Sequence, residues 1–547
     1  MVHFTTMESG DSLADPAPPA VLAIFTGRQD TFGMPHSPTQ KGLLALARAG
    51  AEVWNGWRSH WPAPRVDFTG VNFALEMGSH SFSGFSFGDN ASFDDAQFGD
   101  HTRFEGTQFG HGASFERARF GRFTSFEETR FGTNVWFRHT QFGERASFAR
   151  AQFSTWARFE VVDFGDGASF DGVRFGDNVR FTGSQFGHMA RFTAVEFGAD
   201  AVFTGIRYGN KALFVGAHFD GFTKFSDAVF GEHVAFNGSQ FNSKVEFDGA
   251  LFGSNANFAG TQLGNDAVFD HAQFGTGATF AARDQIVVDT WWCQVCPTDE
   301  ALETRRDCAR QSALRSDAFR RISFRGVQFR GSVSFQNREF LESTDFGPSG
   351  GTPTRFYGVP NFHGCLLHQD TSFEDTEFRA RPTREGARAY RTLKLAMAQQ
   401  HAIREEQRFF RLEMDAEGAS TTRGGQWLFA SYKAVSNYGF SLLRPFLFWV
   451  ICLVTFAMLH GMLSGPSALH TGLDRERTAQ WAEYVLLNAI PLPGFDKIQM
   501  DLRTQLFSGS QATMLAVVIA DMVHEASALV AVFLAGLALR NLFKMKG

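Results

Sequence analysis

The sequence is poor in cysteine and tyrosine, and it has no strong excess of charge of either sign. Five Cys in 547 residues are too few for a disulfide scaffold. The 51 basic and 57 acidic side chains give a formal net charge of -6, which excludes a strongly basic nucleic-acid-binding protein. A hydrophobic content of 44% excludes a long disordered chain. Residues 1–40 carry no secretory signal pattern, so we expect the next segment to fold in the cytoplasm.

Phenylalanine is by contrast very abundant, with 64 Phe against 6 Tyr and 10 Trp. The Phe spacing alternates between five and six residues from Phe82 onward, so the true period is 11. One series runs without exception to Phe280, and the other is interrupted only by Tyr208 and Leu263, which are also apolar. The resulting structural ladder begins with Phe93, Phe98, Phe104, Phe109, Phe115, Phe120, Phe126 and Phe131.

This period excludes a helix, because spacings of five and six residues would place successive Phe on rotating faces. Glycine at this density would also destabilise a helix by roughly 0.5–1 kcal/mol per residue. Short extended segments with regular corners remain, and they predict a four-sided coil of 22 residues whose Phe side chains point inward. Residues 82–280 then give about nine coils and, at ~4.8 Å per coil, a rod of roughly 43 Å without a cleft.

Each unit reads small-x-Phe-x-x, as in Ala91-Ser92-Phe93, and Gly often follows the second Phe. This unit resembles the pentapeptide-repeat proteins in a Phe-rich variant with an extra residue in alternate units. The segment 54–68, with Trp54 and Pro62, also resembles the leader that precedes such repeats. The resemblance implies an all-β repeat solenoid, a right-handed quadrilateral β-helix. It implies no activity, because the family includes DNA-mimicking topoisomerase inhibitors, effectors and many members of unknown role.

DNA mimicry needs a strongly acidic rod. Residues 82–280 hold 16 Lys and Arg and 23 Asp and Glu, which is only mildly acidic. We therefore expect no nucleic-acid partner.

The changes of pattern along the chain predict seven segments. They are a flexible N-terminus (1–40), a helical leader or cap (41–67, with one helix over 42–57), the β-helix (68–280), an insertion (281–318), resumed coils (319–382), an amphipathic helix (383–418) and a membrane module (419–547). The amphipathic helix has two interpretations, a stalk or oligomerising helix and a cap packed on the last coil.

The insertion carries Trp291 and Trp292, which we interpret as part of an interaction surface. Cys293 and Cys296 have the spacing of zinc ligands, and Cys308 could be a third ligand. A second ligand pair is missing and no His lies in the insertion, so incidental thiols and a redox role stay open as alternatives. No cofactor is expected elsewhere in the chain.

Two apolar stretches in the last 110 residues are long enough to cross a bilayer. The first, 440–463, has a single charge at Arg444, near its start. The second, 513–539, is followed by basic residues. Between them, 478–490 is too short to span and predicts an interfacial or re-entrant helix. Basic flanks outside the spans favour both termini and the rod on the cytoplasmic side of a bacterial inner membrane, with a multi-pass topology.

Three polar side chains, Asp521, His524 and Glu525, lie in the first half of the second stretch. Their spacing places them on one helix face, where lipid contact would be costly. They are candidates for an ion path or for a metal site. Alternatively, they lie at the headgroup level or bind the other helix.

The two-span layout is similar to the membrane module of some pentapeptide-repeat proteins and to two-span ion channels. However, 490–495 lacks the carbonyl-rich filter that selects potassium.

No phosphate loop, nucleophile elbow or paired metal-binding His motif occurs, so the sequence does not predict an enzyme. Two hypotheses remain. The first is a membrane-anchored docking scaffold that binds lipid and an unknown protein partner. The second is a homo-oligomeric ion channel or membrane effector that the rod gates, with a pore lined by the second span.

Overall fold

The computed structural model describes residues 39–62, 65–77, 81–282, 318–464, 475–490, 494, 496–507 and 510–544. The chain divides into two compact units. The first contains the chain up to Arg330 together with Glu339–Thr354, and the second contains Gly331–Arg338 together with the chain from Arg355 onward. The first unit is built from short strands, and the second ends in helices.

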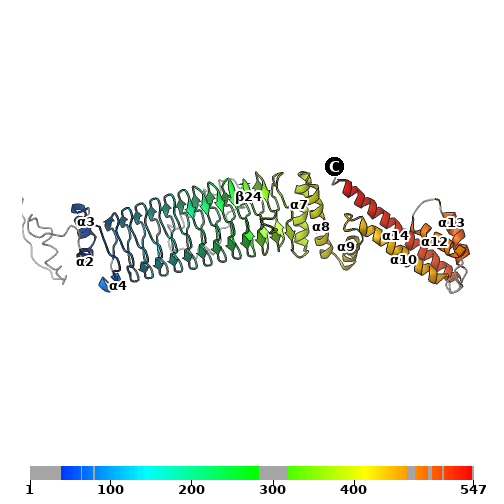
Figure 1. Cartoon of the computed structure of the whole chain (residues 1–547), viewed down its shortest axis with the longest axis horizontal. Coiled ribbons are helices and arrows are strands. Elements are labelled where there is room, and N and C mark those ends of the chain that lie inside the picture. The colour runs from blue at the N-terminus through cyan, green and yellow to red at the C-terminus, as the bar shows by residue number, and fades with distance from the viewer. Residues whose placement is uncertain are drawn as a thin grey trace, which may run out of the picture. The chain divides into compact units, whose positions relative to one another are not determined.

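Short parallel strands, most of them two residues long, build the first unit as a stack of coils (Figure 1). Residues 22 apart pair between neighbouring coils, as Phe109 does with Phe131 and Phe131 with Phe153. This register confirms the predicted all-β solenoid and its 22-residue coil.

The strands of the first unit fall into ladders. The nine-stranded ladder contains β1 (Ser86–Gly88), β2 (Gln108–Phe109), β4 (Arg130–Phe131), β6 (Gln152–Phe153), β8 (Arg174–Phe175), β10 (Glu196–Phe197), β13 (His218–Phe219), β16 (Gln240–Phe241) and β19 (Gln262–Leu263). A second ladder contains, within this unit, β3 (Arg119–Phe120), β5 (Gln141–Phe142), β7 (Asp163–Phe164), β9 (Gln185–Phe186), β12 (Arg207–Tyr208), β15 (Val229–Phe230), β18 (Leu251–Phe252), β21 (Gln273–Phe274) and β25 (Gln328–Phe329). The six-stranded ladder contains β11 (Ala201–Val202), β14 (Thr223–Lys224), β17 (Val245–Glu246), β20 (Asp266–Val268), β24 (Arg321–Ser323) and β28 (Thr344–Asp345). The remaining strands of this unit are β22 (Ala278–Thr279), β23 (Ala318–Phe319) and β27 (Glu339–Phe340).

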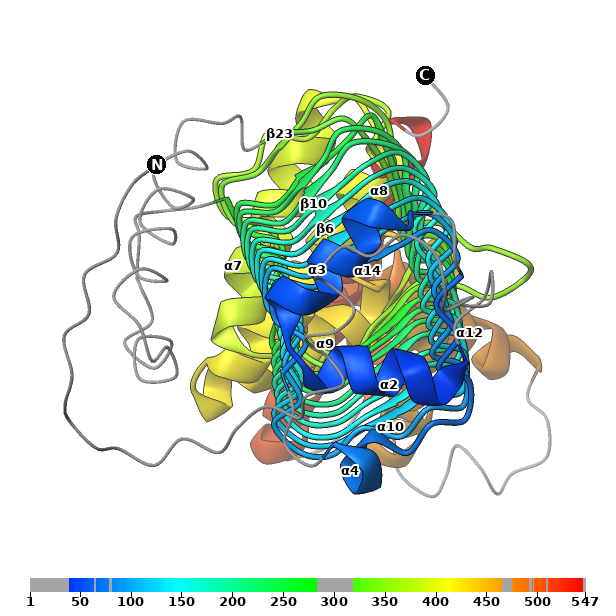
Figure 2. The same cartoon turned by 90° about the vertical axis from the view of Figure 1, so that its left-hand side faces the viewer.

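Each coil has four sides, which Figure 2 shows end-on. Two sides carry the nine-stranded and the second ladder. In the early coils the other two sides are held by single bridges between residues 22 apart, such as Ser92 with Ser114 and Ser125 with Ser147. The first of these bridge columns leads through Val202 into the six-stranded ladder.

Stacked Phe rings fill the interior of the coils. Phe126 stacks on Phe104 and Phe148, with ring centroids 4.6 and 4.9 Å apart and ring planes within 3°. The same ring meets Phe115 and Phe137 edge-on at 6.0 Å. All five rings are fully buried. A ring spacing that equals the ~4.8 Å strand spacing explains why one aromatic residue can recur in every coil.

A glycine column, defined as Gly99 and every 22nd residue to Gly275, directly follows the ladder position that Phe98 begins and that Tyr208 occupies once. At Gly253, an added Cβ would lie 2.6 Å from the carbonyl carbon of Gly231 in the previous coil. Gly205 differs, because its φ is +65° and an added Cβ would meet nothing within 4 Å. Arg117 takes the equivalent turn position at φ 57°. Close approach of the coils, and not backbone conformation, therefore restricts the glycine column to glycine.

Two helices, α2 (Gln40–Arg48) and α3 (Ala51–His60), cover the N-terminal end of the coils (Figure 2). The single leader helix predicted over 42–57 is wrong, because Gly50 with φ 92° separates them. Trp54 is fully buried, contacts Phe85 and Phe87 at 5.5 and 5.3 Å, and donates from Nε1 to the Ser86 carbonyl at 2.8 Å. A short helix, α4 (Phe73–Glu76), follows in the first coil.

The second unit begins with the last coils. Its strands are β26 (Val333–Ser334), β29 (Arg355–Phe356), β30 (Pro360–Asn361) and β31 (Glu377–Phe378). Two helices follow, α7 (Arg384–Gln399) and α8 (Ile403–Ser420). Phe378 and Phe373 contact Phe409 of α8, both at 5.4 Å, so the helix pair caps the last coil.

The single helix predicted over 383–418 is wrong. It breaks between α7 and α8, where His401 has the left-handed φ of 57°. The two halves fold against each other. Glu413 of α8 is 2% exposed at its side chain and pairs with Arg391 and Lys394 of α7, both at 2.6 Å. These partners compensate the buried carboxylate and hold the hairpin closed.

Five more helices of the second unit lie in the described residues. They are α9 (Arg423–Ser436), α10 (Leu443–Leu463), α12 (Arg475–Ala489), α13 (Asp496–Leu506) and α14 (Gln511–Lys544). By length and composition, α10 and α14 are candidate membrane spans, starting and ending within five residues of the predicted 440–463 and 513–539. The sequence prediction missed α9 and α13, which have 14 and 11 residues and lie outside the two long apolar stretches.

Candidate functional site

A buried polar cluster joins four helices of the second unit. His460 of α10 is 0% exposed, and Asp521 and His524 of α14 are 7% and 1% exposed. Tyr484 of α12 and Arg503 of α13 complete the polar cluster, which is defined by these five residues. A separate bond from Trp449 Nε1 of α10 to the Ala489 carbonyl, 2.7 Å long, fixes α12 beside α10.

The Asp521 carboxylate lies at the centre of the polar cluster. Tyr484 Oη donates to Asp521 Oδ2 at 2.6 Å, and Arg503 Nη1 donates to the same oxygen at 3.4 Å. His460 Nε2 lies 3.0 Å from Asp521 Oδ1, close enough for an ion pair but outside hydrogen-bond geometry. Burial and the neighbouring carboxylate raise the pKa of Tyr484, so this phenol stays protonated and remains a donor.

The His524 ring is held by stacking. It lies against Phe456 with centroids 4.6 Å apart and ring planes 14° apart, and its centroid is 6.3 Å from that of His460. Neither of its ring nitrogens hydrogen-bonds another of the described residues. An apolar layer of Phe507, Val517 and Leu502 packs around Tyr484 and separates this side of the polar cluster from solvent.

The polar cluster places one carboxylate among a guanidinium, a phenol and two imidazoles. Such a set can hold helices together through charge-assisted hydrogen bonds. Within the described ranges, no three His, Cys, Asp or Glu side chains are arranged to hold a metal ion.

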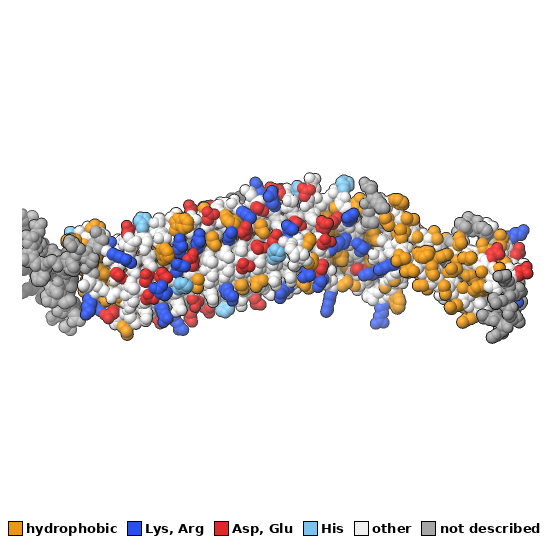
Figure 3. Space-filling view, viewed as in Figure 1, with side chains coloured by type: hydrophobic (Ala, Val, Ile, Leu, Met, Phe, Trp, Pro, Cys, Tyr) orange, Lys and Arg blue, Asp and Glu red, His pale blue; other side chains and the backbone are white. Residues whose placement is uncertain are grey.

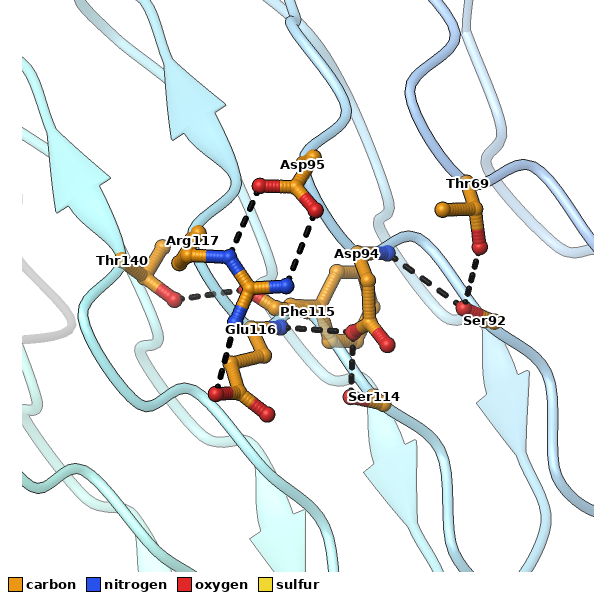
Figure 4. A network of polar contacts seen from close by, with 9 residues as sticks. All are labelled: Thr69, Ser92, Asp94, Asp95, Ser114, Phe115, Glu116, Arg117 and Thr140. Carbon is orange, nitrogen blue, oxygen red and sulfur yellow. Dashed lines mark hydrogen bonds and ion pairs between the residues drawn. The ribbon is translucent and has the colours of Figure 1, made fainter.

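The outer surface of the solenoid carries a second set of polar contacts (Figure 4). Arg117 reaches back to the previous coil, and its Nε and Nη2 donate to the two carboxylate oxygens of Asp95, both at 2.9 Å. Its Nη1 donates to Glu116 at 2.9 Å. The Arg117 hydrogen bonds hold the pKa of Asp95 below its usual value. Both side chains are about half exposed, so we expect the pair to add little stability.

Aromatic and basic side chains meet on another part of this surface. The Arg158 guanidinium lies 4.9 Å from the ring centroid of Trp136 in the previous coil and 6.0 Å from that of Trp156. Arg138 lies 5.7 Å from the Trp136 ring. Because the coil register aligns residues 22 apart, side chains distant in sequence form continuous outward columns.

Residues 104–152 match the sequence model of a protein family described as Pentapeptide repeats (9 copies). The solenoid is a pentapeptide-repeat domain. No curated protein and no solved structure matches the chain. The 22-residue register also occurs on either side of the matched segment, as in the pairs Ser81 with Arg103 and Phe252 with Phe274, so the pentapeptide-repeat architecture extends beyond it.

The ladder residues named from the sequence lie inside the pentapeptide-repeat domain. Phe93, Phe104, Phe115 and Phe126 are 0% exposed, and the alternate members Phe98, Phe109, Phe120 and Phe131 are at most 5% exposed. Trp291, Trp292, Cys293, Cys296 and Cys308 lie outside the described residues, so the interaction surface and metal site predicted there stay predictions.

The three predicted ion-path residues do not share one environment in the structure. Asp521 and His524 turn inward toward α10, α12 and α13, whereas Glu525 lies partly exposed. The sequence prediction missed His460, Tyr484 and Arg503. A histidine in an otherwise apolar span was the one available signal for His460. Tyr484 and Arg503 gave no signal, because only the packing of α12 and α13 against the spans brings them to Asp521.

Proposed function

We propose that this chain is a membrane-anchored pentapeptide-repeat protein whose cytoplasmic solenoid serves as a non-enzymatic docking scaffold. The observation that carries the proposal is the exposed apolar surface of α10. Only 6% of the most apolar window of α10 is buried within the chain, although the helix is almost wholly hydrophobic. Figure 3 shows hydrophobic side chains gathered over the C-terminal helices, whereas the coil surface is a mixture of charged and polar groups.

The lengths of the helices fit the anchor. At 1.5 Å per residue, the 21 residues of α10 extend over about 32 Å, which matches the ~30 Å hydrocarbon core of a bilayer. The 34 residues of α14 are longer than one crossing needs. In water, exposed side chains such as Ile451, Met458 and Phe533 would form an apolar patch of the kind that marks a membrane or protein contact.

The docking role rests on how the solenoid is built. Its interior is filled with Phe rings and its backbone is paired from coil to coil, so sequence variation is confined to outward side chains. These side chains form columns with a spacing of ~4.8 Å, a regular surface suited to an extended protein partner. The fold therefore supports binding of a protein partner along the faces of the solenoid more than catalysis in a cleft.

The polar cluster favours an anchor over a pore. A pore lined by Asp521 would need this carboxylate to face water or a second copy. Here Tyr484, Arg503 and His460 of the same chain enclose it. A carboxylate enclosed in this way stabilises the packing of α12 and α13 against the spans through the two hydrogen bonds to its Oδ2 atom.

Membrane anchorage is tested by washing membranes that contain the full chain at alkaline pH. We expect the wild-type chain to stay in the pellet. We expect a variant with Leu447→Lys, Ile451→Lys and Val454→Lys in α10 to be extracted, because three charges would face lipid. A control with Val161→Lys and Leu251→Lys adds charge to exposed solenoid positions and should stay in the pellet. Extraction of the wild-type chain would refute the anchor.

The docking role is tested in the same membranes with a photoreactive amino acid at Trp156 or Met189, which are both 41% exposed. We expect a discrete cross-linked product from the solenoid and none from a buried control at Phe126. The pore hypothesis predicts instead that proteoliposomes conduct ions and that Asp521→Ala abolishes the flux. A monomer in lipid nanodiscs would rule out the pore.

A further inference from the structure

We propose that α9 lies on the membrane surface and binds anionic phospholipid headgroups. Trp427 and Leu428, near the start of α9, are 77% and 71% exposed. Large apolar side chains as open as these have no partner among the described residues of the second unit. We infer what covers these two side chains from the position of α9 in the second unit and from the charges around it. The inference rests on the membrane anchor proposed above.

The opposite side of α9 is packed, so the helix has a defined outward face. Phe429 fits against Gly418 of α8 so closely that a Cβ at Gly418 would lie 2.8 Å from the Phe429 Cβ. Tyr432 meets Tyr438 edge-on with ring centroids 5.4 Å apart, and Ser436 is fully buried. These contacts fix the rotation of α9 about its axis.

The contacts around α9 also fix its level relative to the two candidate spans. Asn541, near the end of α14, donates to the Gly439 carbonyl in the loop before α10 at 2.8 Å. Arg444, in the first turn of α10, donates to the Lys433 carbonyl of α9 at 2.8 Å. Therefore α9 lies where one span begins and the other ends, which is the level of a membrane boundary.

The chain turns sharply between α9 and α10. Asn437, Tyr438 and Gly439 have φ values of 51°, 58° and 82°, so three successive residues are left-handed and α9 does not continue the axis of α10. Tyr438 Oη and Lys433 Nζ both bind Asp415 of α8, at 2.7 Å, and lock this turn in place. A rigid corner keeps α9 at the boundary and out of the hydrocarbon core.

The charge at this boundary is mostly basic, although Asp415 and Glu406 of α8 pair with Lys433 and Lys544. From Gly418 to the end of α10 there is no Asp or Glu, whereas Arg423, Lys433 and Arg444 are basic. On the α14 side, Arg540 and Lys544 are basic, and no acidic residue follows Glu525. At the other ends of the spans, α12 and α13 mix acidic and basic residues. Exposed Trp beside basic residues is the composition of a helix that lies in an anionic interface.

The test uses the full chain in lipid nanodiscs with phosphatidylcholine brominated near the headgroup end of its acyl chains, which quenches nearby tryptophan. The emission of Trp427 is the difference between the wild-type chain and Trp427→Phe. In discs that also contain phosphatidylglycerol, we expect bromination to remove about half of this emission, because the side chain sits within the outer ~5–10 Å of the acyl region. Trp61→Phe is the matched control, since Trp61 is 58% exposed at the end of α3 and should not be quenched.

The outcomes separate the two proposals. Failure of the full chain to enter nanodiscs refutes the anchor itself. Entry without quenching of Trp427 refutes the surface position of α9 and leaves the anchor intact. Equal quenching with and without phosphatidylglycerol refutes the claim that α9 binds anionic headgroups. Arg423→Gln should lower the phosphatidylglycerol-dependent quenching about twofold, whereas Arg320→Gln, an exposed arginine of the solenoid, should leave it unchanged.

Discussion

Replacing Gly253 by alanine tests whether the close approach of neighbouring coils explains the glycine column. The first atom that the new Cβ meets lies at 2.6 Å, whereas ordinary contact begins at 3.4 Å, so the coils must separate by about 0.8 Å. A rigid separation of that size would stretch the 2.9 Å bond from Gly253 N to the Phe230 carbonyl to about 3.7 Å, beyond hydrogen-bond range.

The expected cost follows from these two effects. Forcing an extra carbon into a packed site costs about 1–3 kcal/mol, and losing a hydrogen bond costs about 1 kcal/mol. We therefore expect Gly253→Ala to destabilise its coil by about 2–4 kcal/mol. Gly205→Ala is the control, because its φ is positive but its surroundings are open. The left-handed conformation costs alanine about 1–2 kcal/mol, and the lower entropy of the unfolded chain offsets part of this, so the net cost should be about 1 kcal/mol.

Hydrogen exchange, measured by mass spectrometry on the full chain, reports the stability of the coils around each substitution in the two variants. A loss of about 3 kcal/mol should speed exchange of the coils around residue 253 by about 100-fold, and the control should change exchange around residue 205 by about fivefold or less. Equal effects at the two positions, or a larger effect at Gly205, would refute the reasoning. The glycine column would then need another explanation.

Three further predictions concern buried or partly buried side chains. Phe126→Ala should lower the free energy of unfolding by about 3–5 kcal/mol and speed hydrogen exchange first in the adjacent coils. An equal loss of exchange protection across the whole chain would contradict coupling between neighbouring coils. Cys365, whose pKa burial raises to about 11, should resist maleimide at pH 8 in the folded chain and react in urea; rapid labelling of the folded chain would contradict its burial. Tyr484→Phe should lower thermal stability by about 1–3 kcal/mol by removing the donor to Asp521, whereas Tyr357→Phe at an exposed position should not; equal melting temperatures would show that the bond adds no stability.

In the membrane module, the sequence predicts the two candidate spans but not the residues that contact their polar side chains. The apolar stretches at 440–463 and 513–539 predict α10 and α14, because spanning a bilayer demands a length and composition that a sequence displays directly. The face shared by Asp521 and His524 was also predictable from helical spacing. Their partners were not, because Tyr484 and Arg503 lie on helices whose packing against the spans has no signature in local periodicity.

By itself, the sequence determined the solenoid. Every coil repeats one pattern and contacts mainly its neighbours, so a period of 11 in Phe is enough to specify the pairing of residues 22 apart. Only the tertiary structure decided where helices break, as at Gly50 and His401, and which polar groups meet. A buried carboxylate is stable only when distant residues compensate its charge, as Lys394 and Arg391 do for Glu413.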